Sequence, residues 1–467
     1  MPGDALDALG AFADPWPRGG PDPQPERSWG GRFAELAEAL GAGGDAGGGW
    51  SEDDLVAVLA EEVDRAQAAM FARRLRATDG LLGDLGSAPA AQLFRVFLRV
   101  RLEGILAAPP PRALRVRGLA DFLYSHAGRL RHAASGGPPL GAVLADLSWR
   151  GVRPGLRHAT VDGVSADGPL FVNLLEVDPR RVRLVARQCR RPGAPARSLT
   201  QVAREEGAVA ATSGGFFLYS EPDIVPPATR YQPVGLLISE GELVSAPSVG
   251  RGALLVDAGG ARIAVVGPPA GAVNRAEAEV GPDTDSIAVV DGEVVAAGRS
   301  LGVPLRGCVI PTTGAWSSGD AYPWPLPAAN AMAGGPLLLR DGVPTLDLRA
   351  EDFWGTAPPR TFSQDETGDT NLLPRLGVGR RPDGTLVFAA CDGRDLDRAL
   401  GWTLRGLGRL LATLGCTDAL NLDGGSSKRM VVEGRVVDLP STEVRGGDRP
   451  AEASVRPVHT AWLMFAE

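Results

Sequence analysis

TLVFAAC at residues 385–391 predicts a β-strand, and DALNL at 418–422 predicts a second one. Between them, apolar residues from Leu396 to Leu414 recur at helical spacing. Strand, helix and strand form a βαβ unit, in which the two strands run parallel and the crossover is nearly always right-handed. We therefore expect Asp392-Gly393-Arg394 and Asp423-Gly424-Gly425-Ser426-Ser427, which follow the two strands, along one sheet edge.

Upstream of this unit, short β-type runs alternate with turn signals such as Asp-Gly and Gly-Gly. These runs are LFVNLLEV (170–177), VRLVAR (182–187), LLISEGELV (236–244), ALLVDAGGARIAVVG (253–267) and SIAVVDGEVV (286–295). The last predicts a hairpin with Asp291-Gly292 at its tip. The expected fold class is α+β, a β-rich mixed-sheet domain over residues 151–467 with one late βαβ unit.

The N-terminal part differs from the rest of the chain in composition and in the spacing of its apolar residues. Residues 1–50 are rich in Pro and Gly and indicate a tail or linker around a short helix near Phe33–Leu40. Ser51 followed by Asp54 resembles a capping box, and apolar residues from Leu55 to Met70 continue at helical spacing. Further helical patterns at 91–106 and 113–131 predict a small all-helical region over 51–150, whose role is open and which could dock a protein partner.

Composition excludes several classes of protein. The net charge of −8 is spread evenly, since residues 1–150 carry 16 basic and 19 acidic side chains, and this disfavours a nucleic-acid partner. The four cysteines form no CxxC pair, and the four histidines form no HxxxH or HExxH pair, so neither a metal nor a cofactor is expected. Lys428 is the only lysine in the chain.

The sequence has no apolar run of the roughly 20 residues that a transmembrane helix needs. Acidic residues precede the first basic residue, Arg18, which is the opposite of a secretory signal. A cytoplasmic location is the expectation from the residues alone.

Ligands of open α/β sheets bind beyond the carboxyl ends of strands, where Asp392, Arg394 and Asp423 are expected together. Each Asp-Gly could equally form only a tight turn. The Gly424–Ser427 segment offers backbone N–H groups and hydroxyls suited to an oxyanion or phosphate. Arg375, in NLLPRLGVG (371–379), could contact an anion or lie in a surface salt bridge.

Two more Gly-Gly pairs follow apolar runs. GAVAATSGGFF (207–217) contains Ser213, Gly214 and Gly215, and NAMAGGPLLLRDG (330–342) contains Gly334 and Gly335. Each pair would let a ligand approach the backbone closely, although a β-bulge or turn explains it equally well. No histidine stands near Ser426 or Ser427 in sequence to act as a base, and His158 and His459 are far from the glycine motifs along the chain.

Six segments in order resemble the phosphodiester glycosidase family: SGGFF (213–217), PVGLLISEGELVS (233–245), GGPLLLRDG (334–342), PRLGVG (374–379), CDGR (391–394) and ALNLDGGSSKRM (419–430). The resemblance covers about residues 151–467. This sequence departs from the family pattern at Ser213, where Asn is usual, at Leu376-Gly377, and after Asp423-Gly424-Gly425.

The resemblance implies hydrolysis of a sugar-1-phosphodiester, carried on a small molecule or glycan, to a free sugar and a phosphomonoester. It implies Asp423 and Asp392 as catalytic carboxylates, and Arg375, Arg394 and the Gly424–Ser427 backbone as the phosphate site. The remaining implied substrate-binding residues are Ser213, Gly214, Gly215, Gly334, Gly335 and Asn421.

Two other functions stay open. One is a non-catalytic module that binds phosphoglycans or sugar nucleotides in envelope polysaccharide metabolism, which the departures at Ser213 and Lys428 favour. The other is a structural role in bacterial exopolysaccharide assembly. The family resemblance also gives an exported or cell-envelope location as the alternative to the cytoplasm.

Overall fold

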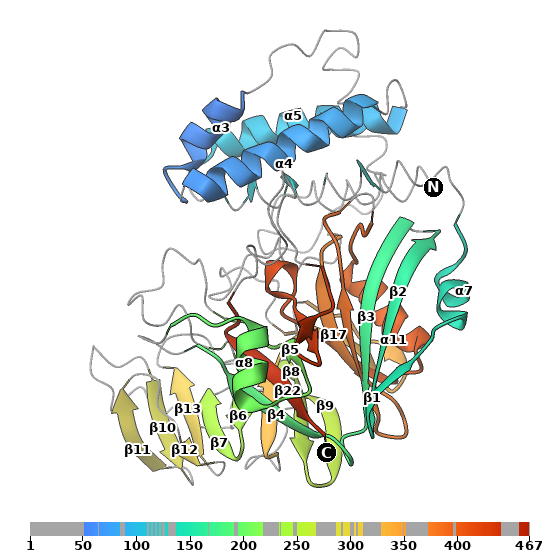
Figure 1. Ribbon diagram of the computed structural model, residues 1–467. Coiled ribbons are helices and arrows are strands. Elements are labelled where there is room, and N and C mark those ends of the chain that lie inside the picture. Colours follow the sequence, from blue (N-terminus) through green and yellow to red (C-terminus); the bar gives the residue numbers. More distant parts are fainter. Residues whose placement is uncertain are drawn as a thin grey trace.

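The structure is a computed structural model, shown in Figure 1. It describes residues 51–63, 65–84, 89–109, pieces of 112–128, and 137–466 with gaps at 167, 191–194, 218–232, 234, 246–249, 268–285, 291–292, 299–302, 305–306, 312–327, 349, 352–371, 396–397 and 440–456. The helix expected near Phe33–Leu40 lies outside the described residues, as does much of the one expected over 113–131.

Three N-terminal helices, α3 (Glu52–Leu59), α4 (Arg65–Asp84) and α5 (Pro89–Ala107), surround an apolar core of their own. Ser51 caps α3, because its hydroxyl oxygen accepts a hydrogen bond from the backbone N–H of Asp54 at 3.1 Å. The apolar pattern that continues to Met70 is divided between α3 and α4, which end and begin on either side of residues 60–64. Both helices pack against the same core, and for this reason the helical spacing of apolar residues continues through the turn between them.

The largest sheet has eight strands in the order β1-β2-β3-β18-β17-β19-β15-β16, and neighbouring strands are antiparallel. Its strands are β1 (Arg150–Arg153), β2 (Leu156–Ser165), β3 (Gly168–Val177), β15 (Leu337–Arg340), β16 (Val343–Pro344), β17 (Arg375–Arg380), β18 (Leu386–Cys391) and β19 (Asp418–Leu422). The short helix α7 (Leu140–Ala145) packs on β2.

Three smaller sheets complete the β-rich part. A five-stranded sheet has the order β21-β20-β5-β22-β4, a six-stranded sheet β12-β7-β6-β14-β8-β9, and a three-stranded sheet β11-β10-β13. Their strands are β4 (Arg183–Gln188), β5 (Ala210–Ser213), β6 (Leu237–Ser239), β7 (Glu242–Ser245), β8 (Arg251–Asp257), β9 (Gly260–Val266), β10 (Ser286–Val290), β11 (Glu293–Gly298), β12 (Val303–Pro304), β13 (Gly307–Pro311), β14 (Asn330–Ala333), β20 (Met430–Val432), β21 (Arg435–Val436) and β22 (Thr460–Phe465). The expected β10–β11 hairpin is present as an antiparallel pair.

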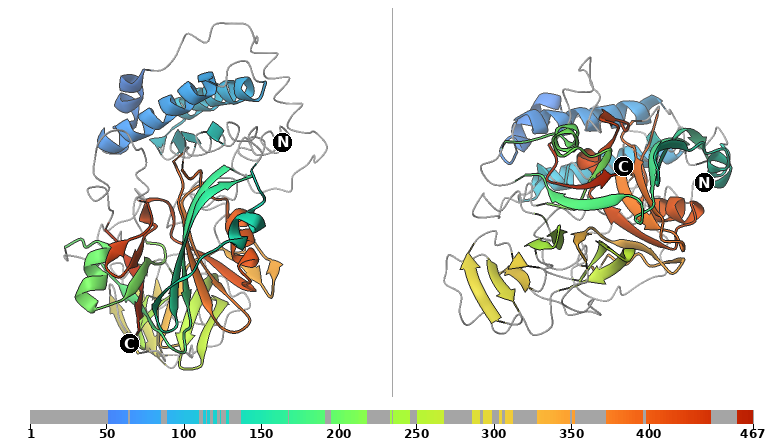
Figure 2. Two further views of the ribbon diagram at one scale, coloured as in Figure 1. Left: turned by 45° about the vertical axis from the view of Figure 1, so that its right-hand side comes forward. Right: turned by 60° about the horizontal axis from the view of Figure 1, so that its bottom comes forward.

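Alternation along the strands divides the apolar side chains between two cores. Leu175 and Val177 of β3 face a core shared with the five- and six-stranded sheets, whereas Val172 and Leu174 face α11 (Leu404–Thr413). The helix α8 (Leu199–Glu206) covers the outer face of the five-stranded sheet. Figure 2 shows α8 and α11 on opposite sides of the β-rich part. The expected α+β, β-rich class with N-terminal helices is therefore confirmed.

The late strand-helix-strand unit forms with its two strands parallel, as predicted, but its helix begins later than expected. Strands β18 and β19 are both antiparallel to β17 and so run parallel to each other, yet β17 lies between them. Helix α11 begins after Thr403, whose hydroxyl caps the Gly406 N–H at 2.9 Å, and not near Leu396. Gly401 has φ 112°, a backbone conformation that stops a helix from beginning earlier.

Close packing of α11 on the sheet gives a test of this arrangement. A Cβ on Gly379 of β17 would lie 2.5 Å from Cys416 Sγ and 2.8 Å from its Cβ. We expect Gly379→Ala to lower the free energy of unfolding by about 1–3 kcal/mol, because the added methyl group overpacks the core. Gly151→Ala in β1 is the control, since nothing lies within 4 Å of the place that its Cβ would take. Urea unfolding of both variants measures the effect, and equal midpoints would contradict the packing described.

Candidate active site

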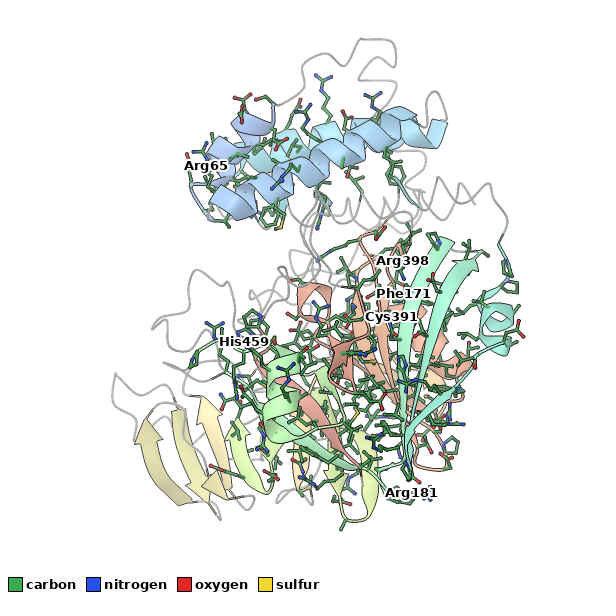
Figure 3. The ribbon with its side chains drawn as sticks, in the orientation of Figure 1. Arg65, Phe171, Arg181, Cys391, Arg398 and His459 are labelled. Carbon is green, nitrogen blue, oxygen red and sulfur yellow. The ribbon has the colours of Figure 1, made fainter. Side chains whose placement is uncertain are left out.

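Three strand ends meet at one edge of the eight-stranded sheet. Strand β17 is antiparallel to both its neighbours, so its first residue, Arg375, lies where β18 and β19 finish. Arg375 pairs with Cys391, and Leu376 pairs with Leu422. Figure 3 labels Cys391 at this edge, beside Phe171 of β3. The edge therefore gathers Arg375 together with the residues that follow Cys391 and Leu422, as the strand directions predict.

The Gly-Gly loops also reach this edge. The Gly214 carbonyl accepts a hydrogen bond from the Asp423 backbone N–H at 3.0 Å. The Gly335 N–H donates to the Asn421 carbonyl at 2.8 Å, and the same carbonyl occupies the space where a Cβ on Gly334 would stand. These contacts bring segments from β5, β14 and β19 together, and they require glycine because the backbones approach so closely.

Gly215 belongs to the same junction. The Ala333 carbonyl occupies the position that a Gly215 Cβ would take, and the Thr460 hydroxyl donates to the Gly215 carbonyl at 3.1 Å. Thr460 begins β22, so the C-terminal strand helps to hold the first glycine loop.

The loop after β19 is the accessible part of this junction. Residues 423–427 are half-buried, whereas residues 213–217, 333–337, 391–394 and 428–430 on the loops around them are buried. The Gly425 N–H donates to the Pro374 carbonyl at 2.8 Å, and the Ser427 N–H donates to the Gly424 carbonyl at 3.0 Å. These two amides of the expected anion nest are therefore used within the protein. The Ser427 bond belongs to the 3-10 turn Gly425–Ser427, and the Gly425 bond joins that turn to the residue before β17.

Both predicted arginines lie close to this loop. Arg375 is buried, its Nε donates to the Trp402 carbonyl at 3.0 Å, and its Cα lies 3.4 Å from the position of a Cβ on Gly424. Arg394 is also buried and has φ 61°. Its guanidinium nitrogens lie 3.7 and 4.0 Å from the position of a Cβ on Gly425. Arg394 thus faces the accessible loop directly.

Asp392 has a different environment from Asp423. Its carboxylate accepts hydrogen bonds from the Lys428 ammonium and, at 3.0 Å, from the Leu439 backbone N–H. Burial raises the pKa of Asp392 to about 6, although the positive charge of Lys428 opposes this increase. Lys428 is fully buried, and Asp392 and Asp438 hold its pKa above the usual value despite the cost of burial.

Two further predicted residues are interior. Ser213 is buried and its hydroxyl oxygen accepts a hydrogen bond from the Arg429 N–H at 2.9 Å. Asn421 is buried and its side-chain amide donates to the Gly335 carbonyl at 2.8 Å. Asn421 therefore fixes the loop that contains Gly334 and Gly335, and Ser213 fixes the backbone of Arg429.

Two neighbours of the junction were not predicted from the sequence. His459, far from the glycine motifs along the chain, stacks on Phe217 directly after them, with ring centroids 3.5 Å apart. Asp438 binds Lys428 at 2.6 Å and Arg429 at 3.1 Å. No local pattern marks either residue, because His459 is far from Phe217 along the chain and Asp438 lies in a segment without a motif. A lone lysine next to the Asp-Gly-Gly motif was the available signal for the charge cluster.

Among the residues that the structure describes, no three His, Cys, Asp or Glu side chains are placed to hold a metal ion. No helix in the same set of residues has the length and apolarity to cross a membrane.

Comparisons with known proteins agree with the resemblance of the motifs. The sequence model of the phosphodiester glycosidase family matches residues 206–465. The chain is 41% identical over 81 residues to the SPbeta prophage-derived uncharacterized protein YomE of Bacillus subtilis (strain 168). That match covers 17% of this chain and 12% of YomE.

Three solved structures show limited similarity to this chain. A hypothetical protein from Synechocystis is 18% identical with TM-score 0.45, over 69% of this chain and 64% of that chain. A putative exported protein from Burkholderia pseudomallei is 23% identical with TM-score 0.44, over 65% and 75%. The catalytic domain of zebrafish N-acetylglucosamine-1-phosphodiester alpha-N-acetylglucosaminidase is 18% identical with TM-score 0.42, over 71% and 95%.

The family match covers more than half of the chain and includes the strands, loops and charged residues that meet at the sheet edge. This chain therefore belongs to the phosphodiester glycosidase family.

Proposed function

We propose that this protein hydrolyses the bond between the anomeric carbon of a sugar and the phosphate of a phosphodiester. Water supplies the oxygen that bonds to the anomeric carbon, and the bond from that carbon to the phosphate oxygen breaks. Its electron pair leaves with the phosphate, and the proton that the attacking water loses passes to the phosphomonoester or to the solvent. The products are a free sugar and a phosphomonoester. Membership of the family supports a hydrolase of this type.

The observation that carries the proposal is the placement of Asp423. This half-buried carboxylate lies on the accessible loop, and its backbone is fixed by the hydrogen bond to Gly214. Arg394 faces the same loop beside Gly425. A carboxylate on this loop and a guanidinium facing it suit a substrate that develops positive charge on its sugar ring and negative charge on its leaving phosphate.

In this arrangement Asp423 stabilises the positive charge on the sugar ring. Arg394 binds the phosphate, and Arg375 adds a second positive charge near the same loop. A phosphate leaves as a weak base, so it needs little protonation. The second carboxylate of ordinary glycosidases is therefore less necessary here. Asp392 does not take that role in our proposal, because its oxygens are bound to Lys428 and to the Leu439 N–H.

Replacement of Asp423 tests the proposal. The experiment incubates purified protein with a panel of sugar-1-phosphodiesters and nucleotide sugars and measures new reducing ends. Asp423→Asn keeps the size of the side chain but removes its charge, and we expect turnover to fall by about 100- to 10,000-fold. Release by the variant at the wild-type rate would remove Asp423 from the mechanism. If the wild type binds these sugars but releases none, the protein is a binding module and not an enzyme.

Arg394 gives a second test, which concerns the phosphate. We expect Arg394→Met to lower kcat/KM by about 100- to 1,000-fold, because a positive charge beside the leaving group is lost. Arg398→Met is the matched control. Arg398 lies four residues further on, is 41% exposed, and stacks on Phe171 with its guanidinium carbon 4.2 Å from the ring centroid. Figure 3 labels both residues. Similar losses in both variants would indicate a general effect of charge near the edge, and not a phosphate contact.

A further inference from the structure

Lys428 is a completely buried lysine that lies between two carboxylates. Its side chain is fully buried and its ammonium group donates to Asp392, to Asp438 at 2.6 Å and to the Leu439 carbonyl at 3.3 Å. An ammonium group has three protons. All three are directed to partners inside the protein, so Lys428 is not placed to bind a substrate phosphate.

The two carboxylates around Lys428 have hydrogen-bond donors at all four oxygens. The second oxygen of Asp392 accepts the Leu439 N–H at 3.0 Å. Asp438 also accepts from the Arg429 guanidinium at 3.1 Å and from the Met430 N–H at 2.7 Å. Two positive and two negative side chains thus form a closed cluster, which we call the Lys428 cluster: Asp392, Lys428, Arg429 and Asp438.

The Lys428 cluster joins the two loops of the candidate active site. Asp392 stands two residues before Arg394, and Lys428 directly follows the accessible loop 423–427. Arg394 adopts a left-handed backbone conformation, which is uncommon for a residue other than glycine and persists only where its surroundings hold it. The contact between Asp392 and Lys428 supplies such a constraint on one side of Arg394.

We propose that Lys428 is a positioning residue, which ties the loop after β18 to the loop after β19 and so holds Arg394 against the accessible loop that carries Asp423. This inference rests on the proposed function. It explains why a costly buried ammonium stands at this position. Stability alone does not explain a buried ion pair, because apolar side chains of similar size stabilise a protein equally well. Positioning does explain it, because a displacement of about 1 Å at a reacting centre can lower the rate by about 100-fold.

A double-mutant cycle on activity separates positioning from a purely structural role. We expect Lys428→Met to lower kcat/KM by about 10- to 100-fold in the wild-type background, and by less than about threefold when Arg394→Met is already present. The exposed Arg435→Met, in the neighbouring strand β21, should leave kcat/KM unchanged. Equal losses from Lys428→Met in both backgrounds would overturn the proposal.

A second variant covers the case in which Lys428→Met does not fold. Lys428→Met combined with Asp392→Asn removes one positive and one negative charge and leaves Asp438 paired with Arg429. We expect this variant to fold but to remain as slow as expected for the single variant, because the tie between the loops is still absent. Recovery of wild-type kcat/KM would mean that Lys428 only neutralises Asp392, and would contradict positioning.

Hydrogen exchange tests the tie independently of the reaction. In Lys428→Met, or in the double variant, peptides covering residues 391–395 and 423–428 should exchange at least about tenfold faster than in the wild type, whereas Arg435→Met should match the wild type. Unchanged exchange in both loops would overturn the proposal. If the wild type releases no sugar from the panel but the two loops of the variants exchange faster as stated, the proposed function is wrong and the link between the loops through Lys428 still holds.

Discussion

The register of β17 between β18 and β19 is the constraint on which the rest of the site depends. A strand that runs against both its neighbours brings its own beginning to the edge where they end. Arg375 therefore lies between Asp392 and Asp423, and neither loop could be moved along its strand without changing that arrangement. Because a shift of one residue in register would turn every side chain of β17 to the opposite core, packing on both faces fixes the edge.

Close backbone contact is the second requirement of the site. The first Gly-Gly loop hydrogen-bonds to Asp423, and the second hydrogen-bonds to Asn421 just before it. Side chains at Gly215 or Gly334 would occupy the space of neighbouring carbonyl groups. The glycines thus act mainly by letting the five-, six- and eight-stranded sheets meet at one point, and the accessible surface is left to residues 423–427.

Local patterns predicted β18 and β19, whose ends form the site, and also the hairpin β10–β11 of the three-stranded sheet. They could not reveal that β17 inserts between β18 and β19, because strand pairing depends on contacts far apart in sequence. The apolar spacing from Leu396 placed the start of α11 too early, since periodicity does not register the left-handed conformation of Gly401. His459 was missed because its contact with Phe217 joins residues far apart in sequence, and Asp438 was missed because no motif marks the segment that carries it.

The two aspartates illustrate how burial separates residues that look alike in sequence. Both follow a strand and precede glycine, yet Asp392 lies inside the Lys428 cluster and Asp423 lies on the half-buried loop. Desolvation raises the pKa of Asp392 to about 6, and the positive charge of Lys428 limits this rise, so the carboxylate is mostly ionised at neutral pH. As pH rises through that pKa, Asp392 loses its proton and the attraction to Lys428 increases. The tie between the two loops is therefore stronger when Asp392 is ionised, whereas a phosphodiester substrate is anionic on either side of that pKa and requires a fixed positive charge at Arg394 throughout.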